Sequence, residues 1–212
     1  MRNKVIIIDY GLGNLLSLKR AIEAVGYDSK ISDSKKEIEN AKILILPGVG
    51  SFENGMENIE KKKLKENIIN TVKKGNNLLG ICLGMQLFFN SSEESKKKIK
   101  GLGLIDGKIV DLKKNLRDDD AKVPHIGWAS FEKLTLKKKF FLKLNKKDDM
   151  YFIHSYYANP KNNQHILATT KYFNISIPSI VNNDNITGFQ FHPEKSGLKG
   201  LELLKSYLDE NN

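Results

Sequence analysis

The chain has 212 residues, of which 40% are hydrophobic and 28% charged, and its formal net charge is +10 at pH 7. Its one cysteine, Cys82, excludes a disulfide framework and a zinc site built from several thiolates. No apolar run approaches the roughly 18 residues of a membrane span, and the first residues lack the features of a secretory signal. We therefore expect one domain over residues 1–212, located in the reducing cytoplasm.

The positive charge would suit nucleic acid or another anionic partner. The lysine runs at 61–63, 96–98 and 137–139 are scattered, however, and no run is interleaved with arginine and aromatic residues. A stacking platform for bases needs such interleaving. We therefore interpret the lysines as solvated surface and expect neither nucleic acid nor a membrane as partner.

The first half of the chain alternates strands and helices. Apolar runs predict buried strands at 4–9, 28–31, 43–46 and 77–80. Helical spacing predicts one helix that begins after Asn14 as its cap and ends at Gly26, and a long second helix at 53–74. This βαβαβ order predicts a parallel sheet.

The second half reads differently. Segments 102–105 and 109–112, on either side of Asp106-Gly107, predict a hairpin. Further strands are expected at 151–157, 166–171, 179–181 and 187–191, and a closing amphipathic helix at 198–208. Polar loops are expected at 91–100, on the surface, and at 115–120.

Cys82 lies in Gly80-Ile81-Cys82-Leu83-Gly84, between the predicted strand and the helix-compatible segment 85–89. G-x-C-x-G in this place is the cysteine form of the nucleophile elbow, in which glycines allow a very tight turn. The turn would place the sulfur at a helix N-terminus, where the dipole favours the reactive thiolate. The alternative is that Cys82 is only a small buried hydrophobic residue.

Phe191-His192-Pro193-Glu194, far downstream, supplies a base and a carboxylate to orient it. With Cys82 they would form a triad in the order Cys, His, Glu. Segments 9–11 and 47–50, like Cys82 and His192, follow predicted strands. In open α/β sheets ligands bind beyond the carboxyl ends of the strands, so these segments are expected to converge on one site.

A thiolate with a His-Glu pair attacks an electrophilic carbonyl, and acyl transfer also needs oxyanion donors. The N–H of Leu83 is one candidate, and the glycine-rich loop 47–50 can present another, although that loop can also be read as a simple turn. These residues alone leave a cysteine protease, a deglycase-like enzyme and an amidase open.

Five segments carry a resemblance to a known family. They are 47–52 (PGVGSF), 80–86 (GICLGMQ), 123–128 (VPHIGW), 151–157 (YFIHSYY) and 189–196 (FQFHPEKS). They resemble the class I glutamine amidotransferases, and more narrowly the glutaminase subunit of imidazole glycerol phosphate synthase. The similarity extends from Asp9 to the last helix. It implies a flavodoxin-like α/β fold with a parallel core, added antiparallel strands and helices on both faces.

The resemblance also implies roles for individual residues. Cys82 attacks the side-chain amide of glutamine, His192 moves protons and Glu194 orients His192. Ammonia leaves, and water cleaves the glutamyl thioester that remains. The further residues implied are the oxyanion donors Leu83, Val49 and Gly50, the glutamine-binding residues Gly50, Gln86, Ser155 and Tyr156, and the partner-facing residues His154, Tyr157 and Lys195.

The implied partner is a (β/α)8 barrel synthase in a heterodimer. It combines the ammonia with a phosphoribosylated aminoimidazole carboxamide intermediate to form imidazole glycerol phosphate. We expect no cofactor, and no metal, since His125 and His165 lack metal-ligand spacing.

Several alternatives remain at this point. His154 can be a satisfied strand histidine, and Trp128 is expected to pack in the core. The family usually has Asn after Gly-Trp, where this chain has Ala129. Other functions to be weighed are a paralogous glutaminase subunit that serves a surface-sugar amidating synthase, a cysteine peptidase of similar fold and an inactive binding module.

Overall fold

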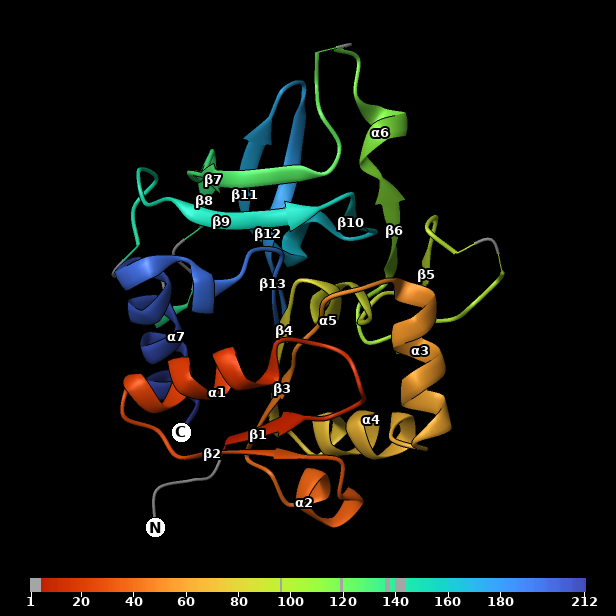
Figure 1. Cartoon of the computed structure of the whole chain (residues 1–212), viewed down its shortest axis with the longest axis vertical. Coiled ribbons are helices and arrows are strands. Elements are labelled where there is room, and N and C mark those ends of the chain that lie inside the picture. Colours follow the sequence, from red (N-terminus) through yellow and green to blue (C-terminus); the bar gives the residue numbers. More distant parts are fainter. Residues whose placement is uncertain (1–4, 96, 119, 136–137, 140–143) are drawn as a thin grey trace.

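The computed structural model describes residues 5–95, 97–118, 120–135, 138–139 and 144–212. Its largest sheet has eight strands in the order β2-β1-β3-β4-β13-β12-β11-β8 (Figure 1). Neighbouring strands are parallel from β2 to β13 and antiparallel from β13 to β8. The strands are β1 (Val5–Ile8), β2 (Ser29–Ser32), β3 (Ile43–Leu46), β4 (Asn77–Ile81), β8 (Lys133–Leu134), β11 (Ile166–Tyr172), β12 (Ile175–Asn183) and β13 (Ile186–Phe189). The expected parallel core with added antiparallel strands is confirmed.

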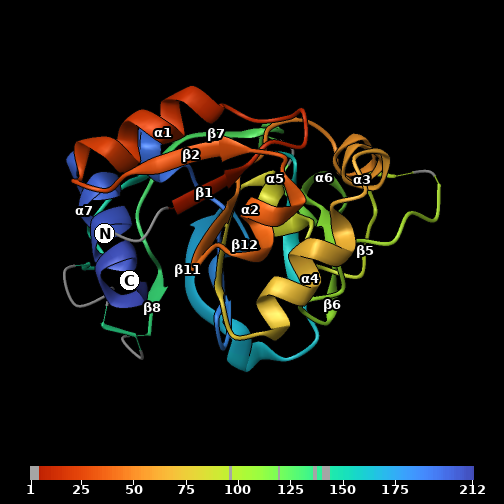
Figure 2. The ribbon, with the colours of Figure 1, turned by 90° about the horizontal axis from the view of Figure 1, so that it is seen from below.

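Helices cover both faces of this sheet (Figure 2). One face carries α1 (Leu15–Ala24) and α7 (Gly197–Asn211), and the other carries α2 (Lys35–Glu39), α3 (Phe52–Lys61) and α4 (Lys65–Lys73). The central strands are apolar on both sides because each face has a helical layer to cover it. In the described ranges no helix combines the length and apolar character needed to cross a membrane.

Two small sheets complete the second half. One has the strand order β10-β6-β5 and the other is the pair β7-β9. The strands are β5 (Ser91–Ser92), β6 (Gly107–Asp111), β7 (His125–Ala129), β9 (Met150–His154) and β10 (Tyr156–Pro160). Short helical turns link these parts: α5 (Leu83–Gln86), α6 (Leu112–Asn115), η2 (Asn163–His165) and η3 (Pro193–Lys195). In Figure 1 the pair β7-β9 lies above the carboxyl ends of the central strands.

The predicted long helix at 53–74 is wrong, because the chain forms α3 and α4 with a break between them. Lys63 has φ +54°, and its N–H donates to Glu60 while that of Leu64 donates to Ile59. A left-handed residue at this point ends the first helix, and the fully buried Leu64 anchors the start of the second.

The predicted hairpin around Asp106-Gly107 is also wrong. Strand β6 pairs with β10 and β5, whereas the segment 102–105 forms no strand and bonds through Leu102 and Leu104 to the chain after α5. The expected strand 151–157 is divided at Ser155 into β9 and β10, which belong to different sheets. Asn14 stands at the start of α1, but its side chain makes no capping bond.

Four expectations fall partly outside the described residues. They concern residue 4 of the first strand, residues 96 and 119 in the two polar loops, and residues 96 and 137 in the lysine runs.

Candidate active site

The cysteine and the histidine come from two neighbouring parallel strands. β4 pairs with β13 so that Ile81 stands opposite Phe189, and the N–H of Cys82 donates to the Phe189 carbonyl over 2.7 Å. His192 lies three residues further along the same segment. The strand pairing thus brings together two residues that are 110 positions apart, as expected for the carboxyl ends of a parallel sheet.

The turn at Cys82 has the geometry of a nucleophile elbow. Cys82 has φ +51° and ψ −110°, a conformation that is unusual for a residue with a Cβ atom and stores strain. A Cβ at position 84 would lie 1.8 Å from the Leu46 carbonyl oxygen, so only glycine fits there. The following helix α5 has only four residues, so its dipole is small.

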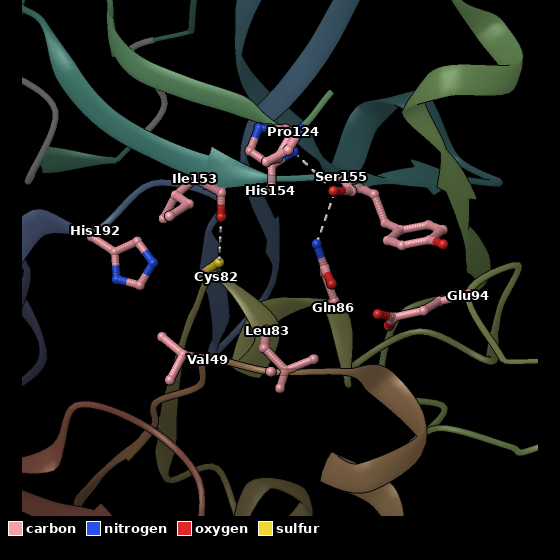
Figure 3. Close-up of a pocket in the computed structure, with 12 residues that line it drawn as sticks. Val49, Cys82, Leu83, Gln86, Glu94, Pro124, Ile153, His154, Ser155 and His192 are labelled. Carbon is pink, nitrogen blue, oxygen red and sulfur yellow. Dashed lines mark hydrogen bonds between the residues drawn. The ribbon is translucent and has the colours of Figure 1, made fainter. Parts of the chain in front are cut away.

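His192 and Glu194 form a buried pair. Nδ1 of His192 lies 2.8 Å from Oε1 of Glu194, and the two side chains are 2% and 3% exposed. Burial lowers the pKa of His192, but the adjacent Cys82 sulfur and the Glu194 carboxylate raise it more, to about 10. Because Glu194 occupies Nδ1, Nε2 of His192 is left to face the cysteine (Figure 3).

The backbone of His192 is held against the pair β7-β9. Its N–H donates to the Tyr151 carbonyl, and its carbonyl accepts a bond from the Ser196 hydroxyl. That hydroxyl in turn accepts from the N–H of Tyr151. Ser196 is the last residue of the FQFHPEKS segment, and this double contact gives it a structural reason to be there.

The sulfur of Cys82 has two further polar neighbours. The carbonyl oxygen of Ile153 and Nε2 of Gln190 both lie 3.8 Å from Sγ. The cysteine is 7% exposed and opens into a cavity of about 280 Å³ (Figure 3). The sulfur is therefore reachable from this cavity while it is surrounded by protein groups on its other sides.

The loop 47–50 has a fixed half, Pro47 and Gly48, which is tightly packed, and a free half, Val49 and Gly50, which is less constrained. A Cβ on Gly48 would lie 2.6 Å from the Tyr10 hydroxyl, which donates to the Pro47 carbonyl, so this end is tightly packed. Gly50 has φ +120°, a Cβ there would make only ordinary contact with Leu12 at 3.7 Å, and Val49 is 39% exposed. Val49, Gly50 and Leu83, the three predicted oxyanion residues, all line the cavity.

The predicted glutamine-binding residues Gly50, Gln86, Ser155 and Tyr156 line the same cavity. Gln86 is buried, and its amide nitrogen donates to the Tyr156 carbonyl over 2.9 Å. The structure therefore brings every residue predicted for catalysis or glutamine binding to one cavity or, for Glu194, directly behind it.

Sequence reasoning missed Glu94, Pro124 and Ile153, which also line the cavity. Glu94 was expected in a surface loop but is half-buried, and its carboxylate accepts a bond from the N–H of Phe52. Burial raises the pKa of Glu94, and the nearby Glu53 raises it further. Its signal in the sequence was only an acidic residue in a polar segment, which is too weak to identify it.

The residues predicted to face a partner differ in position. Lys195 is exposed on η3 and Tyr157 is half-buried on β10. His154 is 6% exposed, its Nδ1 donates to the Tyr156 carbonyl, and it lines the cavity instead of facing outwards. This fits the alternative reading of a satisfied strand histidine.

His125 and His154 form a hydrogen-bonded pair beneath the surface of β7 and β9. Nδ1 of His125 lies 3.2 Å from Nε2 of His154, and His125 stacks on Phe152. Burial lowers the pKa of His125 to about 4, and burial together with His125 lowers the pKa of His154 to about 3. Both side chains are therefore neutral at pH 7.

The expectation that Trp128 packs in the core is wrong, because its side chain is 57% exposed. Alternate residues of β7 point outwards, so Ile126 is 56% exposed as well. Ile126 pairs with Ile153 of β9, which is 38% exposed. These three residues form an apolar rim, and Ile153 belongs to both the rim and the cavity.

Comparison with known proteins places this geometry in a family. The profile of the family "Glutamine amidotransferase class-I" matches residues 6–209. The chain is 46% identical over 203 residues to the imidazole glycerol phosphate synthase subunit HisH of Caldanaerobacter subterraneus subsp. tengcongensis, covering 95% of each chain. It is 43% identical over 208 residues to the corresponding subunit HisH 2 of Methanococcus maripaludis, covering 97% of this chain and 99% of the relative.

Among solved structures, PurLQS from Thermotoga maritima is similar with a TM-score of 0.76 at 18% identity, covering 99% of each chain. This likeness supports the fold. The family profile and the two relatives each match nearly the full length of the chain, so they support the family assignment as well. The chain is a glutamine amidotransferase that belongs to the class I family and, within it, to the HisH subunits.

Proposed function

We propose that this protein is the glutaminase subunit of an imidazole glycerol phosphate synthase and supplies ammonia for histidine biosynthesis. The observation that carries the proposal is the buried arrangement of Cys82, His192 and Glu194 beside a small cavity, in a chain 46% identical to a HisH subunit. The proposed reaction is the hydrolysis of L-glutamine to glutamate and ammonia.

The geometry supports a two-step acyl transfer. The sulfur of Cys82 attacks the side-chain amide carbon of glutamine, and Nε2 of His192 delivers a proton to the departing nitrogen. Ammonia leaves and a glutamyl thioester remains on Cys82. His192 then takes a proton from water, which attacks the thioester and releases glutamate. Glu194 holds Nδ1 of His192 and stabilises its positive charge throughout.

The oxygen of the amide acquires negative charge in both steps, so it needs donors. Leu83 is the first residue of α5, and its N–H has no partner within the helix. We propose it as one donor and the peptide between Val49 and Gly50 as the other. The positive φ of Gly50 and the conformational freedom of glycine allow that peptide to change direction.

The far end of the cavity suits the amino-acid part of glutamine. Glu94 is the carboxylate among the lining residues and can pair with an α-ammonium group. Gln86, Ser155 and Tyr156 supply hydrogen-bonding groups nearby. A cavity of about 280 Å³ that carries a carboxylate fits a single amino acid better than the extended chain that a peptidase must bind.

We propose a (β/α)8 barrel synthase as the partner, in a heterodimer. The relatives are each named as a subunit, and the apolar rim of Ile126, Trp128 and Ile153 offers a docking surface next to the cavity. We propose, from the resemblance, that Tyr157 and Lys195 also face the partner, whereas His154 is buried and lines the cavity. The ammonia would convert the phosphoribosylated intermediate into imidazole glycerol phosphate and aminoimidazole carboxamide ribotide.

We further propose that residues 1–212 form one domain that works in the cytoplasm. The eight-stranded sheet takes strands from both halves of the chain, which supports a single unit. The proposed chemistry is carried by side chains and backbone groups alone. The names of the relatives favour this acceptor over a surface-sugar synthase.

The deciding experiment combines the protein with a histidine-pathway barrel synthase and its phosphoribosylated substrate. Glutamine should support formation of imidazole glycerol phosphate. With Cys82→Ala, glutamine should fail while ammonium salts still support the reaction, because the barrel remains intact. A wild-type protein that releases ammonia from glutamine but yields no product would reject the acceptor, and one that cleaves peptides but not glutamine would reject the glutaminase.

A further inference from the structure

We propose that Gln190 is a positioning residue for the cysteine: its side-chain amide donates to the Cys82 sulfur while its carbonyl holds the amide of Gln86. The proposal rests on the proposed function, in which Cys82 is the nucleophile and Gln86 contacts glutamine. It adds a residue that prepares both the sulfur and the substrate pocket.

Gln190 occupies a place where an apolar residue would be expected. It directly follows β13, and its neighbours Phe189 and Phe191 stack on each other with ring centroids 5.2 Å apart. Gln190 itself is fully buried, and its backbone N–H donates to the Ser179 carbonyl. Burying a primary amide is costly unless the amide is hydrogen-bonded, so its partners indicate why it is there.

The hydrogen-bond network fixes which way the amide of Gln190 points. The backbone carbonyl of Tyr156 can only accept, so the group of Gln86 that lies 2.9 Å from it is the NH2 group. The same nitrogen of Gln86 lies 3.2 Å from the side-chain oxygen of Gln190. The NH2 group of Gln190 is then directed at Cys82, with Nε2 3.8 Å from Sγ.

The effect of the Gln190 N–H on the charge of the sulfur is opposite to that of the Ile153 carbonyl. The Ile153 carbonyl, also 3.8 Å from Sγ, can accept from a thiol but repels a thiolate. An N–H donor favours the thiolate, which is the form that attacks. The geometry therefore gives Gln190 the task of offsetting the Ile153 carbonyl, in addition to the support from His192.

The effect of Gln190 can be separated from that of the titratable groups around the sulfur. These are His192 with Glu194 on the β13 side, Tyr10 from the chain after β1, and His154 from β9, which lines the same cavity as Cys82. A change at residue 190 leaves all four in place. Cys82 is the one cysteine of the chain, so the rate of thiol alkylation reports on this sulfur alone.

The test compares alkylation by iodoacetamide across pH in wild type and in Gln190→Leu, which keeps the bulk but not the donor. The control is Gln164→Leu, at an exposed position on η2. We expect Q190L to react about tenfold more slowly near pH 7 and to need higher pH for full reactivity, since a hydrogen bond to a charged group is lost. KM for glutamine should also rise because Gln86 loses a partner. A folded Q190L with the alkylation profile of wild type would overturn the proposal.

A second measurement needs no change at residue 190. The chain has three glutamines, so selective ¹⁵N labelling of glutamine side chains gives three amide groups to follow by NMR. The Gln190 amide should shift with pH over the range in which the sulfur becomes reactive, and Cys82→Ala should abolish that shift. A Gln190 signal as indifferent to pH as that of Gln164 would reject the proposal. The alkylation rates and the NMR shifts do not use turnover, so failure of the glutaminase assignment would be seen separately.

Discussion

Nδ1 of His192 lies 2.8 Å from Oε1 of Glu194, and this contact joins two side chains that are almost completely buried. The bond fixes the orientation of the imidazole and directs Nε2 at Cys82. The proposed proton carrier and the group proposed to orient it are thus only two residues apart in the sequence. Their separate contributions can be tested by single substitutions.

His192→Ala should reduce glutamine hydrolysis by about 10²–10⁴-fold, because the group that moves protons is removed. Glu194→Gln should cost clearly less, since the amide can still contact Nδ1 but no longer stabilises the imidazolium. Steady-state ammonia release measures both. Equal and small losses from the two variants would contradict the assigned roles.

Cys82→Ala should abolish glutamine hydrolysis while the chain remains folded, because alanine fills the same position with a smaller side chain. An alkylating glutamine analogue should label wild type at Cys82 and leave C82A unlabelled, as mass spectrometry of the intact protein would show. Circular dichroism checks the fold. Near-wild-type hydrolysis by C82A would show that another group is the nucleophile.

Glu94→Gln should raise KM for glutamine by about tenfold and leave kcat within a few-fold, because the lost charge-assisted bond lies at the amino-acid end of the substrate. Glu53→Gln, which removes a neighbouring carboxylate outside the cavity, serves as the control. A fall in kcat with unchanged KM would place Glu94 in the chemical step instead.

The isolated subunit should be a poor glutaminase that is stimulated by a barrel partner carrying its ligand, because the free half of loop 47–50 can hold its donor in the wrong direction. A bias of ~3 kcal/mol would change the rate by roughly a hundredfold. Gly50→Val should therefore reduce stimulated turnover, and it should also lower thermal stability because a β-branched residue is strained at φ +120°. Gly48→Val should instead damage packing, since a Cβ there has no space. Full activity of the lone subunit, unchanged by the partner, would refute this mechanism.

Folding stability should fall as pH is lowered from about 6.5 towards 4, because of His125 and His154. Their pKa values in the folded protein, about 4 and about 3, lie below the ordinary 6.5, so between these limits the unfolded chain binds more protons. Each histidine can contribute up to ~1.4 kcal/mol per pH unit in that window. Urea unfolding at several pH values should show a shallower slope for His125→Phe than for wild type. Identical slopes would mean that His125 does not couple to folding.

The sequence was most informative where chemistry is local. The turn at Cys82 and the His192-Glu194 pair are encoded by neighbouring residues, so the triad could be read from short motifs. Trp128 could not, because its exposure depends on β7 forming a separate small sheet with β9. The positions of Gln190 and Glu94 in the site depend on contacts with residues that are 108 and 42 positions away in the sequence. No local sequence pattern reveals such contacts.

The prediction of one helix over 53–74 failed for a similar reason. The apolar spacing of α3 and α4 is continuous enough to suggest one helix, and the break depends on the left-handed conformation of Lys63. Lysine has no particular preference for that conformation, so tertiary packing around Leu64 decides it. The hairpin at 106–107 was misread because β6 finds its partners in β5 and β10 rather than in the adjacent segment.

The pairing of β4 with β13 also has a consequence for how the protein is made. β13 is inserted between β4 and β12, although both of those strands precede it in the chain. Until the ribosome has synthesised the chain beyond Phe189, β4 lacks the neighbouring strand that holds Cys82 in place. His192 is also still missing at that stage. The centre of the sheet therefore closes late in synthesis, and the growing chain lacks the proposed triad until the fold can be completed.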